Sequence, residues 1–102
     1  MWVEVLTEDE VADGRGVRVD VGGERIAVFR DGERFYAIGD RCSHAEASLS
    51  EGEVFDGEVE CPRHGAVFDL ASGAAKSLPA TRPVPTYGVR ARDGVVEVEV
   101  SP

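Results

Sequence analysis

Two short, matched pairs of metal-binding side chains constrain this 102-residue chain more than any other feature. The segment Cys42-Ser43-His44 is followed, after sixteen residues, by Cys61-Pro62-Arg63-His64-Gly65, and the two segments contain every cysteine and every histidine of the protein. Thiolate sulfur and imidazole nitrogen are the ligands that zinc and iron–sulfur centres prefer. The candidate metal ligands are therefore Cys42, His44, Cys61 and His64.

The arrangement within each pair bears on which centre they hold. A common zinc finger places both cysteines on one loop and both histidines on a helical turn, whereas here each segment carries one of each. A diiron cluster between two such loops would give one iron two thiolates and the other two imidazoles. Structural zinc uses the same donor atoms and remains an alternative. A disulfide between Cys42 and Cys61 would leave both histidines unexplained, and a Cys–His nucleophile needs only one cysteine.

The order CxH, sixteen residues, CPxHG resembles the ligand motif of the Rieske family, in which two histidines replace two cysteines on one iron of a 2Fe-2S cluster. The resemblance implies one Rieske-type cluster, with Cys42 and Cys61 on the inner iron and His44 and His64 on the outer iron, near the surface. Neutral imidazoles in place of thiolates raise the reduction potential into a window of roughly −150 to +300 mV.

The positions around the ligands refine this expectation. High-potential members of the family carry two further cysteines and a serine that brace the loops and donate to a cluster sulfur, and here those positions hold Ala47, Arg63 and Ala66. Fewer hydrogen bonds to sulfur favour the low end of the potential window.

The resemblance covers essentially the whole chain and is closest to the ferredoxin components of bacterial ring-hydroxylating dioxygenase systems. It implies a soluble electron carrier that takes single electrons from a flavin-dependent reductase and passes them to a terminal Rieske non-haem iron oxygenase. Such a carrier is not itself an enzyme, and no catalytic residue is expected. Two alternatives remain: an iron–sulfur accessory or sensor protein linked to cluster assembly, and a zinc-stabilised interaction module.

The net charge of the chain indicates which kinds of partner it can bind. Twenty acidic and 11 basic residues give a net charge of −9, which argues against nucleic acid and anionic membranes as partners and is compatible with a basic protein partner. The longest apolar runs are only about four residues, too short to span a membrane. The first residues do not read as a signal peptide. We therefore expect a cytoplasmic monomer with transient protein partners.

Short alternations of apolar and charged residues, separated by glycine-containing turns, predict an all-β fold. We expect one Rieske domain over residues 1–102, with an antiparallel β-sandwich base and a cluster-binding subdomain at about residues 39–70, made of two loops on a β-hairpin. The expected strands of the base are residues 2–6, 17–21, 25–29, 33–37, 86–91 and 95–100, the first four forming a meander. A capping box should start one helical turn at residues 7–10.

Asp56-Gly57, a type I′ turn signal, should join residues 53–55 and 58–60 in the hairpin that fixes the spacing of the two loops. Val54 and Val59 should face inward. The glutamates of the hairpin should then form a solvent-side strip that serves either solvation or docking, namely Glu51, Glu53, Glu58 and Glu60.

The three prolines of residues 79–85 predict a stiff, extended loop. The Rieske resemblance implies that Pro79 and its neighbours cover one side of the cluster.

Overall fold

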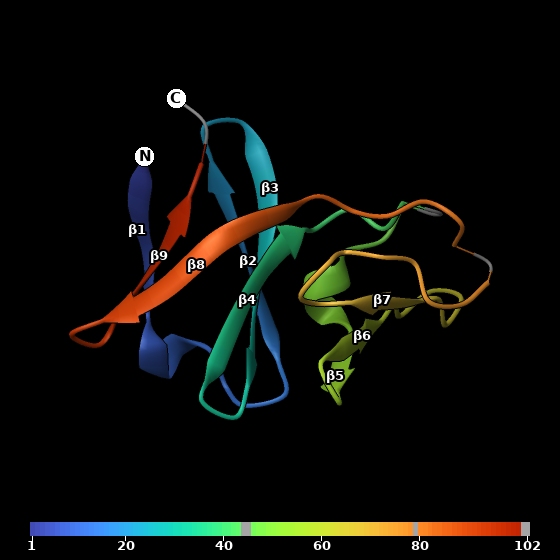
Figure 1. Cartoon of the computed structure of the whole chain (residues 1–102), viewed down its shortest axis with the longest axis horizontal. Helices are drawn as coiled ribbons and strands as arrows, with labels where there is room; N and C mark the ends of the chain where they lie inside the picture. The colour runs from blue at the N-terminus through green and yellow to red at the C-terminus, as the bar shows by residue number, and fades with distance from the viewer. Residues whose placement is uncertain (44–45, 79, 101–102) are drawn as a thin grey trace.

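The computed structural model describes residues 1–43, 46–78 and 80–100. Nine strands and two short 3-10 turns account for the regular structure of these residues (Figure 1), which confirms the all-β prediction. Among them no helix is long and apolar enough to cross a membrane. In chain order the elements are β1 (Trp2–Thr7), η1 (Glu8–Glu10), β2 (Gly16–Val21), β3 (Glu24–Asp31), β4 (Arg34–Gly39), η2 (Leu49–Glu51), β5 (Glu53–Phe55), β6 (Glu58–Glu60), β7 (Val67–Asp69), β8 (Thr86–Arg92) and β9 (Val95–Glu99).

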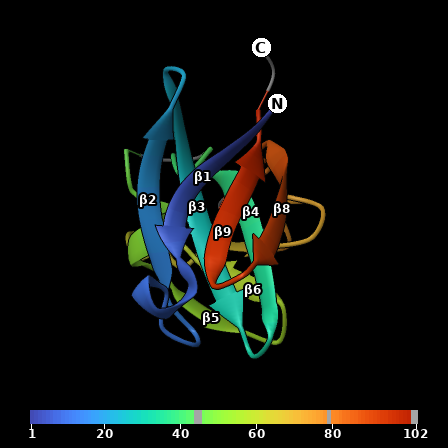
Figure 2. The ribbon, with the colours of Figure 1, turned by 90° about the vertical axis from the view of Figure 1, so that its left-hand side faces the viewer.

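Six strands form the base sheet in the order β1-β9-β8-β4-β3-β2, and every neighbouring pair is antiparallel. The sheet curls so that its two halves face each other (Figure 2), as expected for a sandwich-like base. Val96 and Val98 are fully buried, whereas Glu99 is exposed, so the alternation in the sequence places one face of β9 in the core. The core between the two halves contains Val11, Ile26, Val28, Ala37, Val96, Val98 and Val100.

The meander has three strands rather than the four predicted. β2, β3 and β4 pair in sequence, but β1 pairs with β9, with Trp2 opposite Glu99. The predicted capping box is present, and the backbone N–H of Thr7 donates to the Glu10 carboxylate at 2.8 Å. After η1 the chain continues into β2 at the opposite edge of the sheet, so β1 does not join the meander and occupies the edge beside β9. Pairing between residues nearly a whole chain apart leaves no trace in the local pattern.

The remaining three strands form a small second sheet in the order β5-β6-β7. The predicted turn at Asp56-Gly57 has positive φ at both residues, 52° and 74°, which is the type I′ geometry. Val59 is fully buried and Val54 packs against the core, as expected. The subdomain is therefore larger than a hairpin, because β7 adds a third strand along β6.

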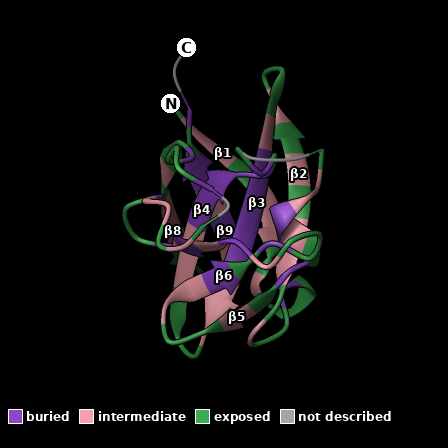
Figure 3. Ribbon diagram, turned by 90° about the vertical axis from the view of Figure 1, so that its right-hand side faces the viewer, coloured by how far each residue is buried: buried purple, intermediate pink, exposed green. Residues whose placement is uncertain are grey.

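One hydrophobic core joins the two sheets. Phe29 and Ile38 from the base sheet pack in the same cluster as Val59 and Phe68 from the small sheet, and all four side chains are fully buried. Figure 3 shows this buried seam behind the exposed loops. The loops beside the small sheet are consequently fixed to the base through packed side chains.

Truncation of this shared core should destabilise the protein strongly. Phe68→Ala is expected to lower the free energy of unfolding by about 3–5 kcal/mol, because it removes a fully buried ring and leaves a cavity. Phe55→Ala is the matched control on the opposite edge of the same small sheet, since that ring is 46% exposed, and it should cost under about 1 kcal/mol. Denaturant unfolding followed by circular dichroism measures both. Equal losses would contradict a shared core.

Candidate metal centre

Three loops meet at the end of the molecule beyond the small sheet (Figure 1): residues 40–48, 61–66 and 70–85, called loops 1, 2 and 3. Cys42 comes from loop 1 and Cys61 from loop 2. Both cysteines are free thiols, 2% and 1% exposed. The Cys42 side chain lies within hydrogen-bonding reach of Cys61. The structure thus brings together two predicted ligands that are nineteen positions apart in the chain.

Loops 1 and 2 close in the same way. The backbone N–H of Cys42 donates to the carbonyl of Ala47 at 3.0 Å, and that of Cys61 donates to the carbonyl of Ala66 at 2.7 Å. Each cysteine therefore opens a loop that is tied five residues later. Gly65 has φ of 77°, a conformation that L side chains rarely adopt, so a glycine suits this position in loop 2.

The environment of the Cys61 sulfur is built by the backbone of its own loop. Burial raises the pKa of the Cys61 thiol, and the neighbouring Cys42 raises it further. The backbone N–H groups of Arg63 and His64 donate to this sulfur and act in the opposite direction. The Cys61 sulfur is thus buried and accepts two backbone N–H groups, an environment that suits a sulfur bound to a metal.

The two kinds of predicted ligand differ in exposure. His64 lies exposed three residues after the buried Cys61. The fourth predicted ligand, His44, lies outside the described residues. Within residues 1–43, 46–78 and 80–100, no group of three or more His, Cys, Asp or Glu side chains is gathered so as to hold one metal ion. The described part of the site is therefore an inner pair of thiols with an imidazole on the solvent side.

Loop 1 is anchored by a buried carboxylate that sequence reasoning did not identify. Asp40 is fully buried and precedes Cys42 by two residues. Its carboxylate accepts hydrogen bonds from the Ser48 hydroxyl, from the backbone N–H of Ser50 at 2.9 Å and from the Arg25 guanidinium at 3.2 Å. Desolvation alone would raise the pKa of Asp40, but these hydrogen bonds together lower it. The ionised carboxylate thus ties both ends of loop 1 to β3.

The sequence gives only a weak indication that Asp40 anchors loop 1. Asp40 and the two serines fit an ordinary polar loop, and Arg25 lies in a different strand. Only the pairing of β3 with β4, in which Ile26 lies opposite Gly39, brings Arg25 beside Asp40.

Loop 3 is held against loop 1 and against β7. The Ser43 hydroxyl donates to the Arg82 carbonyl at 2.7 Å, and the Ser77 hydroxyl accepts from the Val67 N–H at 3.0 Å. Ala80 and Val84 are buried in the shared core. Pro79, predicted to cover the cluster, lies outside the described residues. The described residues of the loop are therefore fixed at several points.

The glutamates predicted to form an acidic strip are not all fully exposed to solvent. Glu53 and Glu60 lie opposite each other across β5 and β6, and both are exposed. Glu58 lies opposite Phe55 and is half-buried. The strip runs along the flank of the small sheet.

Comparison with known proteins places this geometry in context. The family model described as Rieske [2Fe-2S] domain matches residues 1–88. The ferredoxin subunit of anthranilate 1,2-dioxygenase from Burkholderia cepacia is 49% identical over 98 residues, which cover 96% of this chain and 86% of that protein. The ferredoxin of carbazole 1,9a-dioxygenase from Nocardioides aromaticivorans IC177 superposes with a TM-score of 0.91 at 39% identity, over 96% of both chains.

A second similar structure shows a ferredoxin with its partner. It is described as a complex of reduced oxygenase and oxidized ferredoxin in carbazole 1,9a-dioxygenase. The match is 39% identical with a TM-score of 0.87, over 95% of this chain and 91% of that one.

Removal of the loop 1 anchor should cost more than removal of an exposed ion pair. Asp40→Ala leaves Arg25, Ser48 and Ser50 without their acceptor, and we expect a loss of about 2–4 kcal/mol in the free energy of unfolding, less than for a fully buried pair because Arg25 is 33% exposed. Asp20→Ala removes the carboxylate of a surface pair with Arg18 and should cost under about 1 kcal/mol. Denaturant unfolding compares the two variants, and equal costs would contradict the anchor.

Proposed function

The chain belongs to the Rieske [2Fe-2S] domain family, and we propose that Cys42, Cys61, His44 and His64 hold its cluster. The cofactor is a Rieske-type 2Fe-2S cluster. The two thiols would hold one iron and the two imidazoles the other, and of the two imidazole residues His64 is exposed to solvent. The observation that carries this assignment is the contact of two buried free thiols from separate loops, with exposed His64 three residues after Cys61 in the chain.

The donor set fits such a cluster chemically. Two ferric ions and two sulfides carry a charge of plus two, so two thiolates bring the oxidised centre to neutrality, whereas four thiolates would make it doubly negative. When bound, the cluster accepts and releases one electron. The burial of Cys42 and Cys61 keeps water from the thiolates, and the N–H groups on Cys61 stabilise the added negative charge. Exposed His64 gives the electron a short path to the surface.

The protein is an electron carrier of the kind found as the ferredoxin subunit of ring-hydroxylating dioxygenases. We propose that it receives electrons singly from a flavin-dependent reductase and delivers them to a terminal Rieske non-haem iron oxygenase. The similarity to a ferredoxin solved in complex with its oxygenase supports the second partner. The first partner follows from the need for a donor that splits electron pairs into single electrons.

The remaining features of the proposal concern how the carrier works in the cell. It acts as a monomer in the cytoplasm, where the two thiols stay reduced until the cluster binds them. It performs no substrate chemistry of its own, and the oxygenase carries out the hydroxylation. Reductase and oxygenase bind it transiently, in turn.

The cluster type has a direct spectroscopic test. The purified protein should be red-brown, and its reduced form should give an electron paramagnetic resonance spectrum with an average g value below that of clusters held by four thiolates. The reason is that two nitrogen ligands replace two sulfur ligands on the iron that becomes ferrous. A colourless protein with one zinc ion per chain would instead support the zinc-stabilised interaction module.

The ligand role of His64 is tested through the reduction potential. His64→Cys replaces a neutral imidazole by a thiolate, so the added negative charge should lower the midpoint potential in protein-film voltammetry. Thr81→Cys is the control, since it adds an exposed thiol on loop 3 and removes no imidazole. An unchanged potential in a cluster-containing His64→Cys protein would argue against ligation by His64.

A further inference from the structure

The end of the molecule that bears the cluster loops carries charge of the opposite sign to the rest. Loops 1 and 2 contribute Arg41 and Arg63, loop 3 contributes Arg82, and all three are exposed. We call these three residues the arginine face. Lys76, also exposed, lies on loop 3 as well. The acidic residues of the three segments 40–48, 61–66 and 76–84 are Asp40 and Glu46.

Two of the three arginine side chains contact Glu46 of loop 1. The guanidinium of Arg41 lies 3.7 Å from the Glu46 carboxylate, and Arg63 donates to the Glu46 carbonyl at 3.3 Å. The backbone of Arg82 is held by the Ser43 hydroxyl, next to Cys42. Arg41 and Arg63 therefore contact the same residue of loop 1, and the backbone of Arg82 lies against Ser43 of that loop.

The charge of the chain divides unevenly between this end and the remainder. The three segments hold four basic and two acidic residues, a balance of +2, which leaves seven basic and 18 acidic residues elsewhere, a balance of −11. Asp40 is buried and paired with Arg25, so Glu46 is the one exposed carboxylate in these segments among the described residues. A partner that approaches the cluster end meets positive charge, although the net charge of the protein is −9.

From this division we propose that the arginine face docks against an acidic surface of the redox partner. The proposal rests on the function proposed above and assigns the sign of charge that the partner presents at the point of electron transfer. Guanidinium groups pair with carboxylates through two parallel hydrogen bonds, and arginine is enriched at protein interfaces. The strongly acidic remainder is repelled by such a partner, which turns the cluster end toward it.

The proposal differs from the expectation drawn from net charge, that of a basic partner. Net charge describes the molecule seen from far away. At an ionic strength of 0.1 M charges are screened beyond about 10 Å, whereas the molecule is 38 Å long. An oxidant or protein that touches the cluster end therefore responds to the charge of the arginine face rather than to the net charge of the whole protein.

Small charged oxidants test the local sign of charge without a known partner. The cluster-loaded protein is reduced with dithionite, freed of excess reductant and mixed with ferricyanide in a stopped-flow instrument, so that one electron passes from each protein to each oxidant. For this anionic oxidant the rate should fall at least about twofold as the salt concentration rises from 0.1 to 1 M, because screening removes an attraction. With the cationic oxidant hexaammineruthenium(III) the rate should rise.

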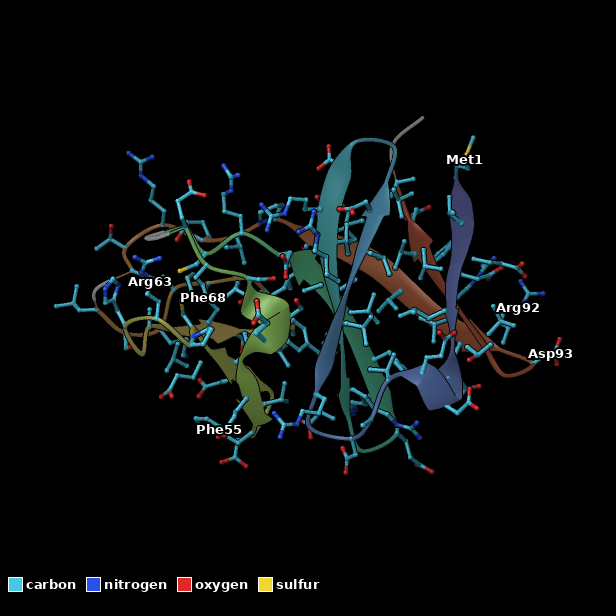
Figure 4. The ribbon with its side chains drawn as sticks, turned by 180° about the vertical axis from the view of Figure 1, so that it is seen from behind. Met1, Phe55, Arg63, Phe68, Arg92 and Asp93 are labelled. Atoms are coloured by element: carbon cyan, nitrogen blue, oxygen red, sulfur yellow. The ribbon has the colours of Figure 1, made fainter. Side chains whose placement is uncertain are left out.

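Charge-reversal variants at matched positions test which residues cause this salt dependence of the rate. Arg41→Glu and Arg82→Glu should each weaken or reverse the salt dependence with ferricyanide, whereas Arg92→Glu should leave it unchanged. Arg92 is exposed and lies at the opposite end of the molecule from Arg63 (Figure 4), so this control makes the same change in net charge far from the cluster. The paramagnetic resonance spectrum of each reduced variant is recorded to show that its cluster is intact.

The outcomes separate this inference from the proposed function. A rate with ferricyanide that rises with salt, or an Arg92→Glu effect as large as that of Arg82→Glu, would overturn the arginine face as the determinant. Either result would leave a functional Rieske carrier in place. A protein that binds no reducible cluster would instead remove the proposed function itself.

Discussion

Burial of two thiols at the junction of two sheets is the constraint on which the rest of the structure depends. Cys42 and Cys61 belong to the same hydrophobic cluster as Phe29 and Phe68, so the candidate ligands are part of the core. In a chain of 102 residues the core is small. Metal binding to such thiols contributes to folding as well as to function, because ligands and core side chains are ordered together.

In addition to the hydrophobic core, hydrogen bonds and an ion pair hold the loops around the thiols. Loop 1 is tied through Asp40 to Arg25 of the base sheet, and loop 2 leads directly into β7. Loop 3 is fixed by the hydroxyls of Ser43 and Ser77. The positions of the ligands in the two loops thus depend on separate anchors.

The sequence predicted what local chemistry determines. The Asp56-Gly57 turn located the hairpin of the small sheet, the capping box located η1, and ligand spacing indicated the centre. Contacts set by the tertiary fold were not predictable in this way. The pairing of β1 with β9 and the Asp40–Arg25 ion pair join residues whose own neighbourhoods carry no sign of each other. The arginine face escaped notice for the same reason, since its members lie in three separate loops.

Met1 and Val100, at the two ends of the described chain, lie together. Val100 donates its N–H to the Met1 carbonyl at 2.9 Å, and Figure 4 shows Met1 on the opposite side of the molecule from Arg63. A peptide linker fused at either terminus would therefore leave the electron-exchanging tip unobstructed. Anchored to an electrode or a scaffold through such a linker, the protein would present its redox centre outward.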